Sequence, residues 1–164
     1  MELRIREMKE EDLPRVYAIN RLSFTTDAWS EEAMQREFRL PYSLRFVVES
    51  GGEIVAYAFV WLIKGEAFLM TLAVAPEWRG KGVGKWFLRK IVERLKGKAE
   101  VVSLDVRKSN IPAIRLYRSL GFKVVRERLR FYSDGENALL MELQLDKIEM
   151  HAGDKGKTAE PVDR

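Results

Sequence analysis

The stretch VAPEWRGKGVGKWFLRK, from Val74 to Lys90, carries the information that decides the fold. It places three glycines at alternate positions, with basic residues between them, directly before a segment in which apolar residues recur every three or four positions. Glycines let backbone N–H groups approach a ligand closely, and the start of a helix carries partial positive charge. The stretch therefore predicts a strand that ends near Val74, a glycine-rich turn, and a helix whose first turn binds an anion such as a phosphate group.

Two common phosphate-binding loops do not fit this stretch. A P-loop needs a glycine at the position of Arg79 and a serine or threonine at the position of Trp86. A dinucleotide-binding loop needs a longer final spacing than that between Gly82 and Gly84. The alternative to an anion site is a solvated basic helix that follows an ordinary turn.

The composition predicts a single domain. The chain has 164 residues, of which 46% are hydrophobic, and we expect one domain over residues 1–146 and a polar tail over 147–164. The chain has no cysteine, and its one histidine, His151, lies in that tail. A cysteine acyl-enzyme is therefore excluded, and a Ser-His-Asp triad or a metal site is not expected. Abundant charge without cysteine resembles the composition of thermophilic proteins, which we state as a hypothesis.

The formal net charge of +4 favours anionic partners but is too small to indicate nucleic acid. The excess is local, because eight lysines or arginines and one acidic residue lie between Arg79 and Lys98. No run approaches the roughly 20 apolar residues of a membrane span, and the first residues are too charged for a signal peptide. We therefore expect a cytoplasmic protein without a membrane partner.

Periodicity and turn residues predict an α/β (α+β) domain with a mixed, mostly antiparallel sheet and about four helices, in the order β α α β β β α β α β β. Ser30 and Asn110 are expected to cap the second and fourth helices. The expected elements are a strand at 3–5, helices at 10–22 and from 30, strands at 45–50, 53–63 and 67–75, a helix at 83–96, a strand at 101–107, a helix at 110–120, and a hairpin of strands at 122–132 and 137–145.

Three separate motifs resemble one family. Arg79-x-x-Gly82-x-Gly84 resembles the acetyl-CoA pyrophosphate motif of the GNAT family of N-acetyltransferases. SLDVRKSNIPAIRLYRSLGF, residues 103–122, resembles the second signature of that family, and RFYSDGENALLM, residues 130–141, resembles the aromatic hairpin of RimI-type and archaeal protein N-terminal acetyltransferases. The resemblance covers roughly residues 1–145. It implies a sheet splayed at the acetyl-CoA strand and acetyl transfer to protein N-termini, ribosomal proteins among them. Because the chain lacks cysteine and a core histidine, we expect the transfer to be direct, in a ternary complex.

The same resemblance implies where acetyl-CoA binds. The pantetheine arm would lie along Leu72, Ala73 and Val74, with a backbone N–H near Val74 stabilising the oxyanion at a β-bulge. Plain core packing is the alternative for these three residues. Asn110 would contact the pantetheine arm or the acceptor, cap its helix, or do both. The pyrophosphate would be held, mainly by backbone amides, by Arg79, Gly80, Lys81, Gly82, Val83, Gly84 and Lys85.

Two catalytic residues are implied. Tyr117 matches the tyrosine that protonates the departing CoA thiolate, although its helical spacing alone favours a packed core residue. Asp105 stands where RimI-type enzymes carry a glutamate that accepts the amine proton. Because aspartate is one methylene shorter, Asp105 would act directly or through a water. It could equally be a structural partner of Arg107 or of the arginines at 126–130.

The acceptor groove is expected between a loop and a hairpin. Asp27 and Trp29 precede the second helix, and Phe131 and Tyr132 belong to the hairpin. Together they would hold the first residues of an extended peptide, whereas edge packing is the alternative for the two hairpin aromatics. Two other functions stay open, namely acetylation of a small amine or a lysine side chain, and a CoA-binding or RNA-associated module without turnover.

Overall fold

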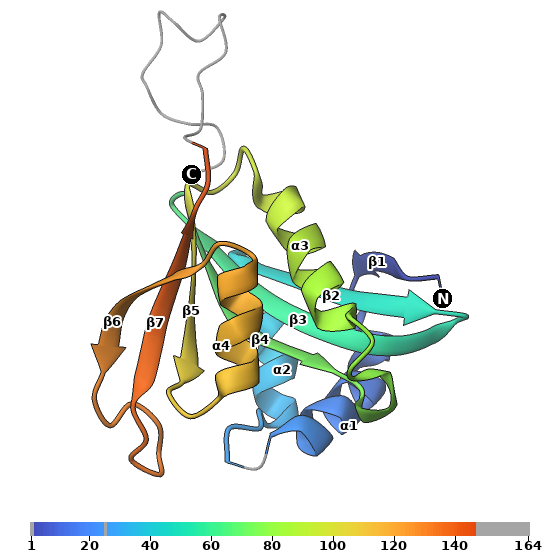
Figure 1. Ribbon diagram of the computed structural model, residues 1–164. Helices are drawn as coiled ribbons and strands as arrows, with labels where there is room; N and C mark the ends of the chain where they lie inside the picture. Colours follow the sequence, from blue (N-terminus) through green and yellow to red (C-terminus); the bar gives the residue numbers. More distant parts are fainter. Residues whose placement is uncertain (1, 25, 147–164) are drawn as a thin grey trace, which may run out of the picture.

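The computed structural model describes residues 2–24 and 26–146, so the expected tail lies outside the described residues. A seven-stranded sheet in the order β1-β2-β3-β4-β5-β7-β6 forms the centre of the molecule (Figure 1). The predicted order of strands and helices is confirmed. The elements are β1 (Arg4–Glu7), η1 (Glu10–Asp12), α1 (Leu13–Ser23), α2 (Glu31–Glu37), β2 (Ser43–Ser50), β3 (Glu53–Ile63), β4 (Glu66–Val74), η2 (Pro76–Trp78), α3 (Val83–Leu95), β5 (Val101–Arg107), α4 (Ile111–Ser119), β6 (Lys123–Arg128) and β7 (Ala138–Gln144).

Strand β3 is buried on both faces and separates two apolar clusters. Ala58 and Val60 belong to the cluster that α3 and α4 complete, whereas Tyr57 and Phe59 belong to the cluster that α1 and α2 complete. This alternation is the period of two expected when successive side chains point to opposite faces. The helices therefore form one layer on each face of the sheet.

Side-chain caps fix where two helices begin. The hydroxyl of Ser30 accepts a hydrogen bond from the Ala33 N–H at 3.1 Å, and the side chain of Asn110 accepts one from the Ala113 N–H at 3.2 Å. Both predicted caps are confirmed. The first helix differs slightly from its prediction, because Glu10–Asp12 form a 3-10 turn and α1 begins only at Leu13.

The sheet is splayed between β4 and β5, the only parallel pair within the described residues. Three residue pairs join these strands, from Glu66↔Val101 to Phe68↔Ser103. Beyond Phe68 the two strands diverge, and α4 lies in front of the divergence in Figure 1. The expectation of a sheet splayed at this strand is confirmed.

The bulge in β4 lies further upstream than predicted. Leu69 pairs with Val60 and Thr71 pairs with Phe59, so Met70 is the additional residue of β4. The prediction put the bulge near Val74, which instead pairs regularly with Ala56. Since a bulge increases local twist, its position just after the last β4–β5 pair helps to turn β4 away from β5.

The C-terminal hairpin has shorter strands than predicted. Strand β6 ends at Arg128 and not at Tyr132, because Arg130 adopts a left-handed conformation with φ of 51°. The Arg130 N–H donates to the side chain of Asn137 at 2.9 Å instead of to a strand. Residues 129–137 therefore form a loop beside the sheet, and this loop carries the predicted aromatic pair.

No helix in the described parts of the chain is long and apolar enough to cross a membrane. The longest, α3, has 13 residues, which corresponds to about 20 Å against the roughly 30 Å of a bilayer core.

Candidate active site

The glycine stretch forms the predicted turn into α3. Gly80 and Gly82 have φ of 76° and 82°, which other residues rarely adopt, and Gly82 is the N-cap of the helix. The first helical hydrogen bond runs from the Trp86 N–H to the Gly82 carbonyl at 3.1 Å. The N–H groups of Val83, Gly84 and Lys85 precede it and have no acceptor within the helix, so they are free to bind an anion.

A pocket of about 410 Å³ opens between this turn and α4. It joins the β4 end, the glycine turn and the start of α4, and its lining is mostly apolar. Eight of the eleven predicted cofactor residues line it, whereas Leu72, Ala73 and Lys81 do not. The lining residues are Val74, Trp78, Arg79, Gly80, Gly82, Val83, Gly84, Lys85, Asn110, Pro112, Ala113 and Leu116.

Four of those lining residues escaped the sequence analysis. Trp78 lies in the 3-10 turn before the glycines, and Lys81 stacks its ammonium 5.2 Å from the Trp78 ring centroid. Pro112, Ala113 and Leu116 come from the first turns of α4. The spacing of Ala113 and Leu116 on one side of that helix was the available signal.

The side chain of Arg79 points away from the turn it introduces. Its Nε donates to the Val74 carbonyl at 3.1 Å, and its Nη2 donates to the Ser23 hydroxyl at 2.9 Å. Arg79 thus links the end of β4 to α1, and the groups that the turn offers to an anion are mainly backbone amides.

The three predicted pantetheine residues end β4. Leu72 and Val74 pack against the α3 and α4 cluster, whereas Ala73 is buried in the α1 and α2 cluster. All three pair with β3, and beyond Phe68 no described residue of β5 pairs with β4 on the other side. One backbone edge of this segment therefore faces the divergence and remains available to a ligand.

Tyr117 lies on α4, beside the pocket-lining Leu116. Its ring centroid is 5.9 Å from that of Phe122, and its side chain packs against the core cluster of α3 and α4. Burial raises the pKa of Tyr117 to about 12. The hydroxyl therefore keeps its proton at neutral pH, which a proton donor requires.

Asp105 lies on β5 and faces the other side of the sheet. Its neighbours Leu104 and Val106 are buried among α3 and α4, so Asp105 and Arg107 point to the face that carries α1 and α2. Oδ1 of Asp105 accepts a hydrogen bond from Nε of Arg128 at 3.0 Å. Of the structural partners considered, Arg128 is the one that pairs with Asp105.

The hairpin aromatics lie close to Asp105. The Phe131 and Tyr132 rings meet edge to face at 5.1 Å, and Phe131 is half exposed. Burial, together with the nearby charges of Asp105 and Asp27, raises the pKa of Tyr132 to about 12. The Tyr132 hydroxyl is therefore neutral at neutral pH and can donate a hydrogen bond.

The other two predicted acceptor residues hold the loop before α2. The Trp29 ring stacks on Phe59 at 5.2 Å, and the Trp29 N–H donates to the Asn20 side chain at 3.1 Å. Both carboxylate oxygens of Asp27 accept hydrogen bonds from Arg107, at 2.8 and 2.9 Å. In this structure both residues make structural contacts, Asp27 with Arg107 and Trp29 with Asn20 and Phe59.

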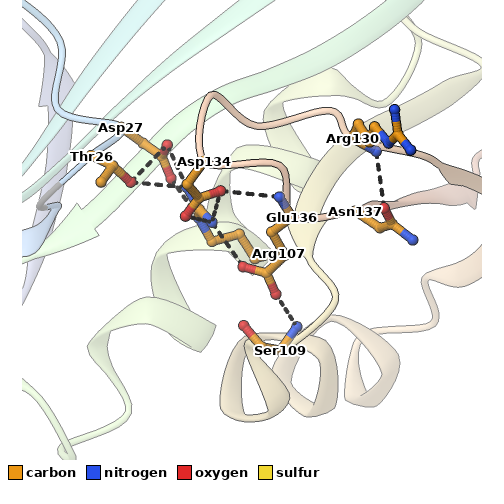
Figure 2. Close-up of polar contacts among 8 residues, drawn as sticks. All are labelled: Thr26, Asp27, Arg107, Ser109, Arg130, Asp134, Glu136 and Asn137. Atoms are coloured by element: carbon orange, nitrogen blue, oxygen red, sulfur yellow. Dashed lines mark hydrogen bonds and ion pairs between the residues drawn. The ribbon is translucent and has the colours of Figure 1, made fainter.

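Arg107 was missed as a site residue by the sequence analysis. Figure 2 shows its guanidinium between Asp27 on one side and Asp134 and Glu136 on the other. These partners are 27 to 80 positions away in the sequence, so no local pattern marks them. The signal that existed was its position within the second resembled motif.

A family profile described as "Acetyltransferase (GNAT) family" matches residues 13–122. The match covers more than half of the chain, including the glycine turn, Asp105 and Tyr117. The chain therefore belongs to the GNAT family of acetyltransferases, which accounts for the splayed sheet and for the pocket beside α4.

Relatives within this family match over most of their length. The chain is 35% identical over 146 residues to a protein from Bacillus subtilis named "Putative [ribosomal protein bS18]-alanine N-acetyltransferase", covering 87% of this chain and 96% of that one. It is 33% identical to an N-alpha-acetyltransferase of Sulfurisphaera tokodaii, covering 88% and 94%. The crystal structure of the ribosomal-protein-S18-alanine N-acetyltransferase from Escherichia coli superposes with a TM-score of 0.84 at 29% identity, covering 92% and 98%.

Proposed function

We propose that this enzyme transfers the acetyl group of acetyl-CoA directly to the α-amine of protein N-termini in a ternary complex. The observation that carries the proposal is the position of Tyr117. It lies next to Leu116, which lines the pocket at the glycine turn, and it also interacts electrostatically with Tyr132 on the acceptor side of the sheet. The relatives matched over nearly their full length bear the names of N-terminal acetyltransferases, which supports the choice of acceptor.

In this proposal the main chain holds the donor. The free N–H groups at the start of α3 bind the pyrophosphate, the open edge of Leu72–Val74 lies along the pantetheine arm, and Asn110 lines the same pocket. A backbone N–H of β4 at the divergence donates to the oxyanion that forms when the amine attacks the thioester carbonyl. Such a donor is typically worth about 3 kcal/mol.

Tyr117 and Asp105 move the protons. As the new C–N bond forms and the C–S bond breaks, the Tyr117 hydroxyl gives its proton to the departing thiolate. Asp105 accepts the amine proton through a water, because Arg128 already occupies one of its oxygens. Phe131 and Tyr132 contact the first residues of the peptide, and Asp27 and Trp29 support the opposite wall.

A modest base suits an α-amine better than a lysine. An α-amine titrates near 7.7–8.0 and a lysine near 10.4, so at pH 7.5 roughly a third of the former but about a thousandth of the latter is neutral. We therefore expect N-termini with small first residues to be acetylated far faster than internal lysines. The alanine substrates in the names of relatives agree with this preference.

Mass spectrometry of matched peptides with acetyl-CoA tests the proposal. One peptide has a free N-terminus and no lysine, the second has a blocked N-terminus and one internal lysine, and a polyamine forms a third arm. Fast modification of the first peptide alone is the expected result. Equal or faster modification of the lysine or the polyamine would contradict the acceptor, and CoA binding without any turnover would indicate a binding module.

We extend this proposal to the physiological acceptor and to the growth temperature of the host. A ribosomal protein is the acceptor we propose, because related enzymes are named for ribosomal protein bS18. A thermophilic host is proposed from the charge-rich, cysteine-free composition. A melting temperature in the mesophile range of about 45–65 °C would contradict the second point.

A further inference from the structure

Arg107 is the most heavily bonded side chain at the acceptor side of the sheet. All three of its guanidinium nitrogens donate hydrogen bonds, and only 18% of the side chain is exposed. The bonds run from Nε to Asp27 at 2.8 Å, from Nη2 to Asp27 and Thr26 at 2.9 Å each, and from Nη1 to Asp134 at 2.9 and 3.1 Å and to Glu136 at 2.8 Å.

These bonds join two loops that belong to distant parts of the chain. Thr26 and Asp27 lie between α1 and α2, whereas Asp134 and Glu136 lie between β6 and β7 (Figure 2). Among the described residues no hydrogen bond or ion pair joins these two loops directly. The arginine at the end of β5 is therefore the polar link between the two walls of the proposed groove.

The charge balance makes this link depend on one residue. Three carboxylates surround a single guanidinium, and they raise the pKa of Arg107 further above its ordinary value. Without the arginine, Asp27 would face Asp134 and Glu136 with no cation between them, and like charges at this range repel. Loss of the guanidinium would therefore push the two loops apart as well as release them.

The guanidinium also supports an aromatic ring that the proposed groove uses. Cζ of Arg107 lies 4.2 Å from the centroid of the Tyr132 ring, a close cation–π contact. Tyr132 in turn meets Phe131 edge to face. The orientation of the Tyr132 ring, and through it that of Phe131, therefore depends on the Arg107 side chain.

We propose that Arg107 is a positioning residue that sets the spacing of the two loops and the orientation of Tyr132, and so controls binding of the acceptor peptide but not of acetyl-CoA. This inference rests on the proposed function for its substrate. Arg107 does not contact the pocket at the glycine turn, whose lining residues do not include it.

Lysine is the informative substitution because it keeps the positive charge and removes the planar guanidinium with its several N–H donors. An ammonium cannot bond two carboxylates from separate loops with the geometry of a planar guanidinium, and it stacks less well on an aromatic ring. Arg107→Lys therefore keeps part of the charge balance while loosening both contacts.

The chain supplies a matched control on β1, an edge strand of the sheet. Arg6 on β1 also donates to two carboxylates, with two bonds to Asp12 at 2.8 and 2.9 Å and one to Glu49 at 2.9 Å. Its side chain is 26% exposed, close to the value for Arg107. Arg6→Lys should therefore disturb a comparable network far from the groove.

The test measures steady-state kinetics with an N-terminal peptide for the wild type, Arg107→Lys and Arg6→Lys, together with CoA affinity by calorimetry. For Arg107→Lys we expect the peptide KM to rise about tenfold, kcat to stay within about threefold and CoA affinity to stay within about twofold. Arg6→Lys should leave all three unchanged. An unchanged peptide KM in Arg107→Lys, or a fall in kcat alone, would overturn the positioning role.

Hydrogen exchange tests the link between the two loops without requiring catalytic turnover. In Arg107→Lys the segments around Asp27 and Asp134 should both exchange faster while the glycine turn keeps its protection, and Arg6→Lys should change neither segment. If wild-type protein fails to acetylate the peptide, the proposed acceptor is wrong, and this measurement still tests the link. Unchanged exchange in both segments would overturn it.

Discussion

The proposed donor site beside the divergence between β4 and β5 is built from main chain, whereas the proposed acceptor site is built from charged side chains. On the donor side, two glycines with positive φ and the open N–H groups of α3 form the proposed anion site. On the acceptor side, the guanidinium of Arg107 holds together loops that are 80 and 27 positions away.

This difference determines which amino-acid substitutions the proposed donor site and the proposed acceptor site each tolerate. A backbone site depends on conformations that few residue types allow, so a single glycine substitution removes it while most side-chain changes leave it in place. A side-chain network depends on one branched cation and on the loops that reach it. Donor binding and acceptor binding should therefore respond to separate sets of mutations, with Tyr117 common to both.

The largest effect is expected at Tyr117, where the two sides meet. Tyr117→Phe keeps the ring and its packing on Phe122 but removes the proton donor, so kcat should fall about 10²-fold with little change in stability. Steady-state kinetics with thermal melting measures both quantities. Tyr42→Phe, which alters a ring packed on Trp61, is the control. Full turnover by the Tyr117→Phe enzyme would assign Tyr117 to the core alone.

A smaller effect, confined to the donor side, is expected at Gly82. A side chain there meets no atom within 4 Å but is strained at φ of 82°, so Gly82→Val should distort the turn and weaken CoA binding more than tenfold. Gly52 has the same φ and equally open surroundings in the β2–β3 hairpin. Gly52→Val should cost similar stability and leave CoA affinity unchanged. Calorimetric titration with CoA makes the comparison, and equal affinities in both variants would contradict the anion site.

An effect of a few-fold is expected at Tyr132, on the acceptor side. Tyr132→Ala removes a ring and a neutral hydroxyl from the proposed groove, so the peptide KM should rise about fivefold while CoA affinity stays constant. Kinetics with varied peptide at saturating acetyl-CoA measures the change. A larger loss of CoA affinity than of peptide affinity would show that the two sides are not separable.

The smallest effect, a change in stability, is expected at Arg6 on the edge strand β1, which belongs to neither the proposed donor site nor the proposed acceptor site. The hydrogen bond from Arg6 holds the pKa of Asp12 below its ordinary value of 3.8. A depressed pKa contributes stability above the unfolded value, and this contribution is lost as the pH falls through the folded value. The stability difference between wild type and Arg6→Met in urea should therefore be about 1 kcal/mol or less at pH 7 and shrink below pH 4. A difference that grows on acidification would contradict this assignment.

Local rules in the sequence were sufficient for two helix starts and for the glycine turn. Ser30 and Asn110 cap helices where their side chains predict it, and the glycine turn precedes α3 where its spacing predicts it. These features depend on residues within one or two turns of each other. A single stretch therefore contains the whole signal.

Features that depend on distant partners were misplaced or missed. The bulge at Met70 follows from how β4 must pair with β3 and then part from β5, which no local pattern encodes. Strand β6 stops early because Arg130 bonds Asn137 across the loop. Arg107 gains its role from acidic residues that only the folded chain brings near it.

Because only three residue pairs join β4 and β5, the contact between these strands is mechanically weak. Hydrogen bonds there give little resistance to a change in angle between the two parts of the sheet. The angle is instead fixed by side chains such as Phe87 and Ile91, which pack in one cluster with β3 and with Leu104 of β5. Helix α3 thus holds the two parts of the sheet at their relative angle. A change in the volume of Phe87 or Ile91 is therefore expected to change how far β4 and β5 diverge, although neither residue lines the pocket at the glycine turn.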